Sequence, residues 1–86
     1  PLNPVTPGHL LCVPTLHVRD AADFPHVSSW AFKLAAEIVH ERGIQANIIT
    51  SVGPLATQSV FHCHLHVVPR RKHDGLHLPW TNQRKG

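Results

Sequence analysis

The chain of 86 residues lacks methionine and tyrosine, and it has no apolar run near the roughly 18 residues that a membrane-spanning helix needs. Its first residues do not show the charged and apolar succession of a secretory signal peptide. We therefore expect neither export nor membrane insertion, and a cytoplasmic location. The missing initiator methionine also suggests a fragment, or the visible part of a longer chain.

Cysteines are few as well. Cys12 and Cys63 stand alone in apolar segments, without the close pairing of a zinc knuckle or a redox CxxC motif. We interpret both as reduced core residues. Aromatic residues are scarce and do not alternate with basic ones, which argues against a nucleic acid as partner.

Histidine, in contrast, is abundant and patterned. His62, His64 and His66 occupy every second position of a segment rich in β-forming residues. Side chains of a strand alternate between its faces, so the pattern predicts three imidazoles on one face and an apolar opposite face that runs from Phe61 to Val67. Imidazole can act as nucleophile, acid or base near neutral pH. Alternate strand residues lie roughly 6.5 to 7 Å apart, which suits several contacts to one phosphoryl centre.

Two other interpretations of this segment remain open at the sequence level. Imidazole nitrogens bind Zn²⁺, Ni²⁺ and Cu²⁺, so the strand could be a metal site. It could also be a solvated face without chemistry.

The remaining pattern predicts a small mixed fold. We expect a strand over residues 9–13, a helix with Asp23 as N-cap and Gly43 at its end, a strand over residues 45–52, and the histidine strand. The last two would form an antiparallel hairpin with the helix on its apolar face and the histidines on the other face. A single domain of this size has a marginal core.

Residues 58–70 resemble the signature of the histidine triad family, in which His-x-His-x-His is followed by two apolar residues. Residues 4–14 resemble that family's earlier strand, and His17 falls where the family carries an additional active-site histidine. The resemblance implies an α+β, HIT-like antiparallel sheet with one main helix on one face. It further implies an N-terminally truncated domain over residues 1–70, because members usually carry two more strands first, and an irregular basic tail over residues 71–86.

The resemblance also implies a catalytic arrangement. His64 would be the nucleophile in hydrolysis or transfer at the α-phosphate of a nucleotide, through a covalent nucleotidyl-histidine. A hydrogen bond from its other ring nitrogen to a backbone carbonyl, expected to be that of His62, would fix its tautomer. His62 and His17 would support this arrangement, and His66 would contact the phosphate oxygens or the departing group.

Substrate contacts are expected from Gln58, Ser59 and Ser51, although Gln58 could merely cap its loop and Ser51 could simply end a strand. Many members carry Asn and Gly where this chain has Ser51 and Thr57. An alternative function is therefore a catalytically weak nucleotide-binding or interaction module that retains the triad. The expected substrate is a purine nucleotide, without a metal ion or other cofactor.

Charge and helix composition lead to further expectations. Eight Lys and Arg against five Asp and Glu give a formal charge of +3, and Arg70 could steer phosphates toward the histidines. The helix has more apolar surface than one small sheet needs to cover, which together with the resemblance implies a homodimer. The other histidines are interpreted as ordinary surface or partly buried residues: His9, His26, His40, His73 and His77.

Overall fold

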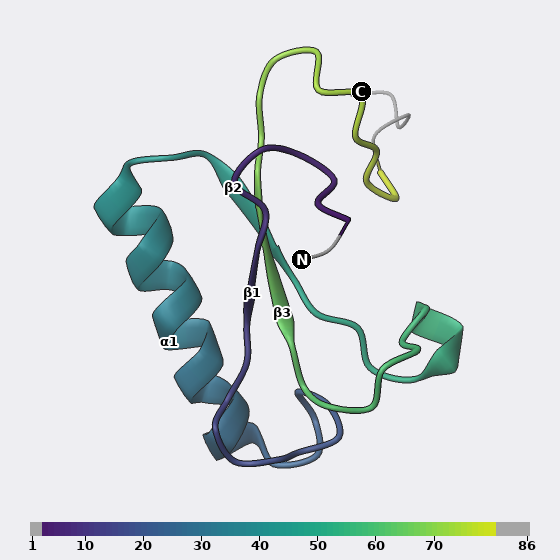
Figure 1. Cartoon of the computed structure of the whole chain (residues 1–86). Helices are drawn as coiled ribbons and strands as arrows, with labels where there is room; N and C mark the ends of the chain where they lie inside the picture. Colours follow the sequence, from purple (N-terminus) through teal and green to yellow (C-terminus); the bar gives the residue numbers. More distant parts are fainter. Residues whose placement is uncertain (1–2, 81–86) are drawn as a thin grey trace.

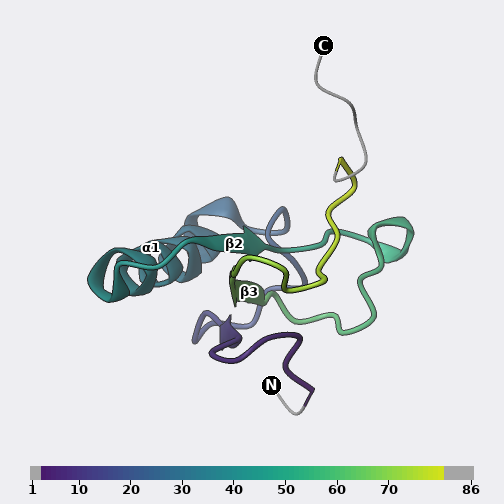
Figure 2. The ribbon, with the colours of Figure 1, turned by 90° about the horizontal axis from the view of Figure 1, so that it is seen from above.

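A computed structural model describes residues 3–80 of the chain. Its elements are β1 (Leu10–Cys12), α1 (Pro25–Arg42), β2 (Ala46–Ile49), the short 3₁₀ helix η1 (Pro54–Ala56) and β3 (Leu65–Pro69). The strands form an antiparallel sheet in the order β1-β3-β2, so the last strand in sequence lies in the middle (Figure 1). Viewed from above, α1 lies on one side of the strands and η1 on the other (Figure 2). The predicted α+β architecture is confirmed.

Proline and glycine set the limits of α1. Pro25 occupies the first turn, where its missing N–H costs nothing, and Gly43 ends the helix with a left-handed φ of 60°. The predicted N-cap is wrong: Phe24 holds that position and makes no side-chain capping hydrogen bond. The Asp23 carboxylate instead accepts the N–H of Arg19 at 2.9 Å, within the turn that precedes the helix.

The core lies between α1 and the sheet face that the alternation predicts. Cys63, Leu65 and Val67 are buried there, and they belong to one cluster with buried residues of α1 and β1: Cys12, Val27, Ala31 and Ala35. Both cysteines are free and buried, and burial raises the pKa of each thiol. Their interpretation as core residues is confirmed.

The histidine strand is shorter than expected, because its neighbours end early. Cys12 pairs with Leu65 as the last pair of β1, and Pro14 follows two residues later without an N–H for a ladder. β3 therefore begins at Leu65, and only His66 of the triad lies in a regular strand. The preceding segment is held in other ways, by Cys63 N–H donating to the Val18 carbonyl and by the Thr50 hydroxyl donating to the His64 carbonyl.

The apolar surface of α1 exceeds what the sheet covers. Trp30, Phe32 and Leu34 are 44%, 41% and 48% exposed, whereas Ile38 and Val39 pack partly against the core. No helix within residues 3–80 is both long and apolar enough to cross a membrane.

Residues 71–80 form neither helix nor strand, yet hydrogen bonds hold them to the sheet. The Arg70 guanidinium donates to both carboxylate oxygens of Asp74, to Asn47 Oδ1 and to the Leu76 carbonyl. This guanidinium, followed by the N–H groups of Arg71 and Leu76, holds the pKa of Asp74 far below its usual range. Arg70 is therefore a structural residue here, and its expected role in steering phosphates finds no support. Residues 81–86 of the predicted tail lie outside the described residues.

Candidate active site

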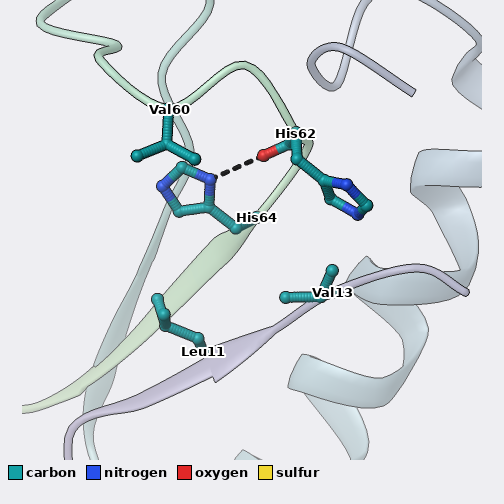
Figure 3. Close-up of a pocket in the computed structure, with 5 residues that line it drawn as sticks. All are labelled: Leu11, Val13, Val60, His62 and His64. Atoms are coloured by element: carbon teal, nitrogen blue, oxygen red, sulfur yellow. Dashed lines mark hydrogen bonds between the residues drawn. The ribbon is translucent and has the colours of Figure 1, made fainter. Parts of the chain in front are cut away.

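His64 lies on the open face of the sheet, opposite α1, and its tautomer is fixed locally. Its Nδ1 is 2.8 Å from the carbonyl oxygen of His62 (Figure 3). A carbonyl can only accept, so Nδ1 carries the hydrogen and Nε2 of the neutral ring keeps its lone pair. This is the hydrogen bond that the sequence analysis predicts for a nucleophilic imidazole.

A hollow of about 330 Å³ opens beside this ring, lined by Leu11, Val13, Val60, His62 and His64 (Figure 3). Three aliphatic side chains around two imidazoles suit a flat, weakly polar group such as a nucleobase. Leu11 and Val13 were not among the site residues expected from the sequence. Strand alternation about the buried Cys12 was the signal for them, because it places both on the histidine face.

His17 and His62 lie next to each other. Their Nδ1 atoms are 2.7 Å apart, so one ring donates and the other accepts. His62 Nε2 is buried and is the one such side-chain nitrogen or oxygen without a hydrogen-bond partner within residues 3–80. The hydrogen between the two rings can therefore lie on Nδ1 of either residue, and in both cases His62 Nε2 can bind a ligand.

The tautomer of His66 follows from two successive hydrogen bonds, from Val5 to His9 and from His9 to His66. The Val5 N–H lies 3.1 Å from His9 Nδ1, which must therefore be the unprotonated nitrogen. A neutral His9 then carries its hydrogen on Nε2, which lies 2.8 Å from His66 Nδ1. His66 accepts on Nδ1, and its own hydrogen is on Nε2.

Electrostatics favour these neutral forms. Burial lowers the pKa of both His9 and His66, and for His66 the neighbouring His9 and His64 rings lower it further. His66 therefore presents an N–H donor next to His64, with the two ring centroids 5.3 Å apart. An acceptor, His64 Nε2, and a donor, His66 Nε2–H, thus lie side by side on one face.

The interpretation of His9 as an ordinary surface or partly buried histidine is wrong. Its side chain is only 8% exposed and is bound to the triad. The register pairs Leu10 with Val67, so the residue before Leu10 falls on the histidine face beside His66. That neighbourhood depends on pairing between distant segments, and the local pattern alone did not show it.

The expected substrate-binding residues do not gather at the hollow. Gln58 is buried, and its side-chain amide serves the loop: Oε1 accepts the Gly53 N–H, while Nε2 donates to the carbonyls of Arg19 and Val60. Its loop-capping alternative is therefore the one that the structure supports. Ser59 is exposed and Ser51 half-buried, and neither lines the hollow.

Within residues 3–80, no three His, Cys, Asp or Glu side chains converge as ligands of a metal ion. The imidazoles are instead bound to one another or to backbone groups. The expectation that the reaction needs no metal stays a prediction.

Comparison with known proteins agrees with this geometry. The model of the HIT domain matches residues 1–73. The chain belongs to the HIT family. It is 34% identical to Protein hit of Bacillus subtilis over 92% of this chain and 59% of that one. It is 32% identical to an adenylylsulfatase of Arabidopsis thaliana over 94% of this chain and 43% of that one, and 32% identical to a bis(5'-adenosyl)-triphosphatase of Saccharomyces cerevisiae over 83% and 38%.

A solved structure leads to the same family. A HIT family hydrolase from Clostridium thermocellum matches with a TM-score of 0.72 and 26% identity, over 85% of this chain and 70% of that one. The chain spans about half the length of the curated relatives it matches. The resemblance found in the sequence is thus confirmed for family and fold.

Proposed function

We propose that this HIT chain is a nucleotide hydrolase that acts at the α-phosphate of a nucleoside phosphoramidate or a dinucleoside polyphosphate. The observation that carries the proposal is the hydrogen bond from His64 Nδ1 to the His62 carbonyl, which leaves Nε2 as a free nucleophile. The relatives named as an adenylylsulfatase and a bis(5'-adenosyl)-triphosphatase support it, because both names denote hydrolysis of an adenosine phosphate compound.

The proposed reaction has two displacements at phosphorus. The His64 Nε2 lone pair forms a bond to the α-phosphorus while the bond to the leaving nitrogen or oxygen breaks, and the departing group takes up a proton from solvent. Water then attacks the nucleotidyl-histidine, the P–N bond breaks, and the nucleoside monophosphate leaves with the hydroxyl while His64 regains its lone pair. The water that attacks in the second displacement returns one proton to solvent. His66 Nε2–H would donate to a phosphate oxygen or to the departing group, which stabilises the charge that develops there.

The aliphatic hollow would take the base. Leu11, Val13 and Val60 offer apolar contact surface next to His64, and a purine presents more of such surface than a pyrimidine. We therefore propose a purine nucleotide as substrate.

Release of AMP from an adenosine phosphoramidate and from a dinucleoside polyphosphate tests the proposal. His64→Ala and His64→Asn should abolish the release and leave the fold intact. His40→Ala, an exposed histidine on α1, is the matched control and should retain full turnover. Turnover at the wild-type rate in either His64 variant would refute the nucleophile.

A second candidate function has its own support. Gln58 is committed to its loop and Ser59 lies away from the hollow, so neither supplies the expected phosphate contacts. The chain would then be a nucleotide-binding module with weak turnover. Calorimetry with AMP and GMP separates the two, because measurable binding without product from any substrate supports the module.

We also propose a homodimer. Trp30, Phe32 and Leu34 are exposed on α1, and the outer edges of β1 and β2 carry no neighbouring strand within the described chain. A second copy could cover both features. Light scattering at micromolar concentration should give twice the 9.5 kDa chain mass, and Trp30→Glu should lower the measured mass. If the wild type is a stable monomer, and Trp30→Glu has the same mass and melting temperature as the wild type, this assembly is refuted.

A further inference from the structure

The segment after β3 holds the turn that carries His9. Arg71 Nη1 donates to the Thr6 hydroxyl oxygen at 2.8 Å and to the Pro7 carbonyl at 3.0 Å. These contacts join residues 64 or more positions apart in sequence. Thr6 is only 7% exposed, and its carbonyl accepts the His9 N–H at 3.1 Å, so both its side chain and its backbone have hydrogen-bond partners.

The position of Arg71 is itself fixed. Its backbone N–H donates to Asp74 Oδ2 at 2.9 Å, and the same carboxylate receives the Arg70 guanidinium. Asp74 thereby holds the backbone of Arg71 and the side chain of Arg70 in place, and the Arg71 side chain extends from there to the Thr6 turn. The two neighbouring arginines have different partners: Arg70 binds within its own segment and to β2, whereas Arg71 binds the turn before β1.

The turn in turn determines what His9 can do. Val5 is the residue before Thr6, and its N–H is the group that holds His9 Nδ1 unprotonated. If the turn shifts, this N–H no longer stays on His9, and the hydrogen of His9 is no longer restricted to Nε2. The donor to His66 Nδ1 would then be lost for part of the time.

We propose that Arg71 is a positioning residue for His66: it holds the Thr6 turn so that the Val5 N–H stays on His9 Nδ1, and it thereby keeps the hydrogen of His66 on Nε2. Arg71 acts through its contacts with Thr6 and Pro7 and from there through Val5 and His9, and it does not line the hollow at His64. The kinetic consequence rests on the proposed hydrolase function, whereas the tautomer of His66 does not.

The first measurement is therefore spectroscopic. Two-bond ¹H–¹⁵N spectra of the labelled full chain report which ring nitrogen of each histidine carries the hydrogen, and the signals of His9 and His66 are assigned by substituting each in turn. Arg71→Ala should move both nitrogen shifts of His66 toward averaged values. Arg71→Lys should restore them in part, because an ammonium group can still donate to Thr6. Lys72→Ala, which removes the same charge from the next residue, should change nothing.

The second measurement is kinetic. Arg71→Ala should lower kcat for AMP release by roughly 2- to 10-fold, within the range expected for a residue that acts through a contact network and no more than the loss expected for His9→Ala, with KM within about twofold. In a His9→Ala background the same substitution should cause no further loss, since the path is already broken. Thr6→Val, which removes the hydroxyl but keeps the shape, should give a smaller loss of the same kind.

The results separate the two proposals. If His66 keeps the wild-type nitrogen shifts in Arg71→Ala, or if Arg71→Ala slows the His9→Ala protein as much as it slows the wild type, the positioning role is refuted. If the wild type releases no AMP, the proposed hydrolase fails, and the spectra alone still decide the role of Arg71.

Discussion

The contact between His9 and His66 leads to a prediction about stability and pH. In His9→Ala, the half-buried His66 loses the donor to its Nδ1, and the Val5 N–H loses its acceptor. A buried polar group without a partner costs about 1–3 kcal/mol. We expect the free energy of unfolding to fall by an amount in this range, which for a chain of this size lowers the melting temperature by at least about 4 °C.

The dependence of the free energy of unfolding on pH should also change, and the burial of both rings determines the direction of that dependence. Burial holds the pKa of His9 and His66 below the ordinary 6.5, so between that value and the lowered pKa the unfolded chain binds more protons than the folded one. The contribution of these two rings to the stability of the wild type is therefore fully present above about pH 6.5 and is lost as the pH falls through their lowered pKa. In His9→Ala one of these groups is gone and the pKa of His66 rises, so this acid loss should become smaller.

Activity should follow the same chemistry. Without the His9 donor, the hydrogen of a neutral His66 can also lie on Nδ1, so the Nε2–H donor is present only part of the time near neutral pH. An imidazolium carries hydrogen on both nitrogens, so the loss of kcat for AMP release should become smaller toward pH 6. We expect about a tenfold lower kcat at neutral pH, less than the 10²-fold or more of losing an acid–base group outright.

Urea unfolding at pH 7.5 and 5.5, with a pH–rate profile, tests these points against His40→Ala as control. A His9→Ala protein whose stability has the acid sensitivity of the wild type, and whose kcat equals that of the wild type at neutral pH, would show that His9 does not control His66.

Three further predictions concern the parts that support the site. Gln58→Leu leaves the Gly53 N–H and two carbonyls unpaired and should lower the free energy of unfolding by about 1–3 kcal/mol, measured in urea; an unchanged midpoint would contradict its loop role. Gly8→Ala should lower the free energy of unfolding by about 1–2 kcal/mol because of its φ of +85°, and by a further amount because the new Cβ would lie 3.3 Å from Pro69 Cγ. Gly75→Ala is the control: its φ is +73° but its Cβ would meet open space, so only the backbone contribution is expected. Equal melting temperatures of the two variants would refute the contribution of the contact. Leu11→Asp should raise KM for an adenosine phosphoramidate more than it lowers kcat, and an unchanged KM would remove the hollow as base site.

Local chemistry made part of this fold predictable. Pro25 and Gly43 mark the ends of α1 because each has a backbone restriction or freedom that a helix end requires. The hydrogen bond from His64 to the His62 carbonyl joins residues two apart, and it was expected from the mechanism that the resemblance to the histidine triad family implies. Features of this kind depend on a few neighbouring residues.

Tertiary partners decided what the sequence pattern did not show. The length of β3 depends on where β1 ends, and the role of His9 depends on the register between β1 and β3. Gln58 was expected at the phosphate, but its side-chain amide forms hydrogen bonds with backbone groups of its loop and of Arg19, because leaving these groups unpaired would lower stability. The Arg70 side chain is likewise bound within the segment after β3.

The two imidazoles at the centre of the proposed chemistry thus differ in what their protonation depends on. The tautomer of His64 is set by a carbonyl two residues away, so it persists wherever this short segment keeps its shape. The tautomer of His66 depends on Val5 and His9, and by our proposal on Arg71, which come from opposite ends of the described chain. Loosening of the segment after β3 should therefore disturb the donor at His66 before the nucleophile at His64. A protein in that state would still form the bond from His64 to phosphorus, but it would stabilise the departing charge less well, so the fault would appear in kcat.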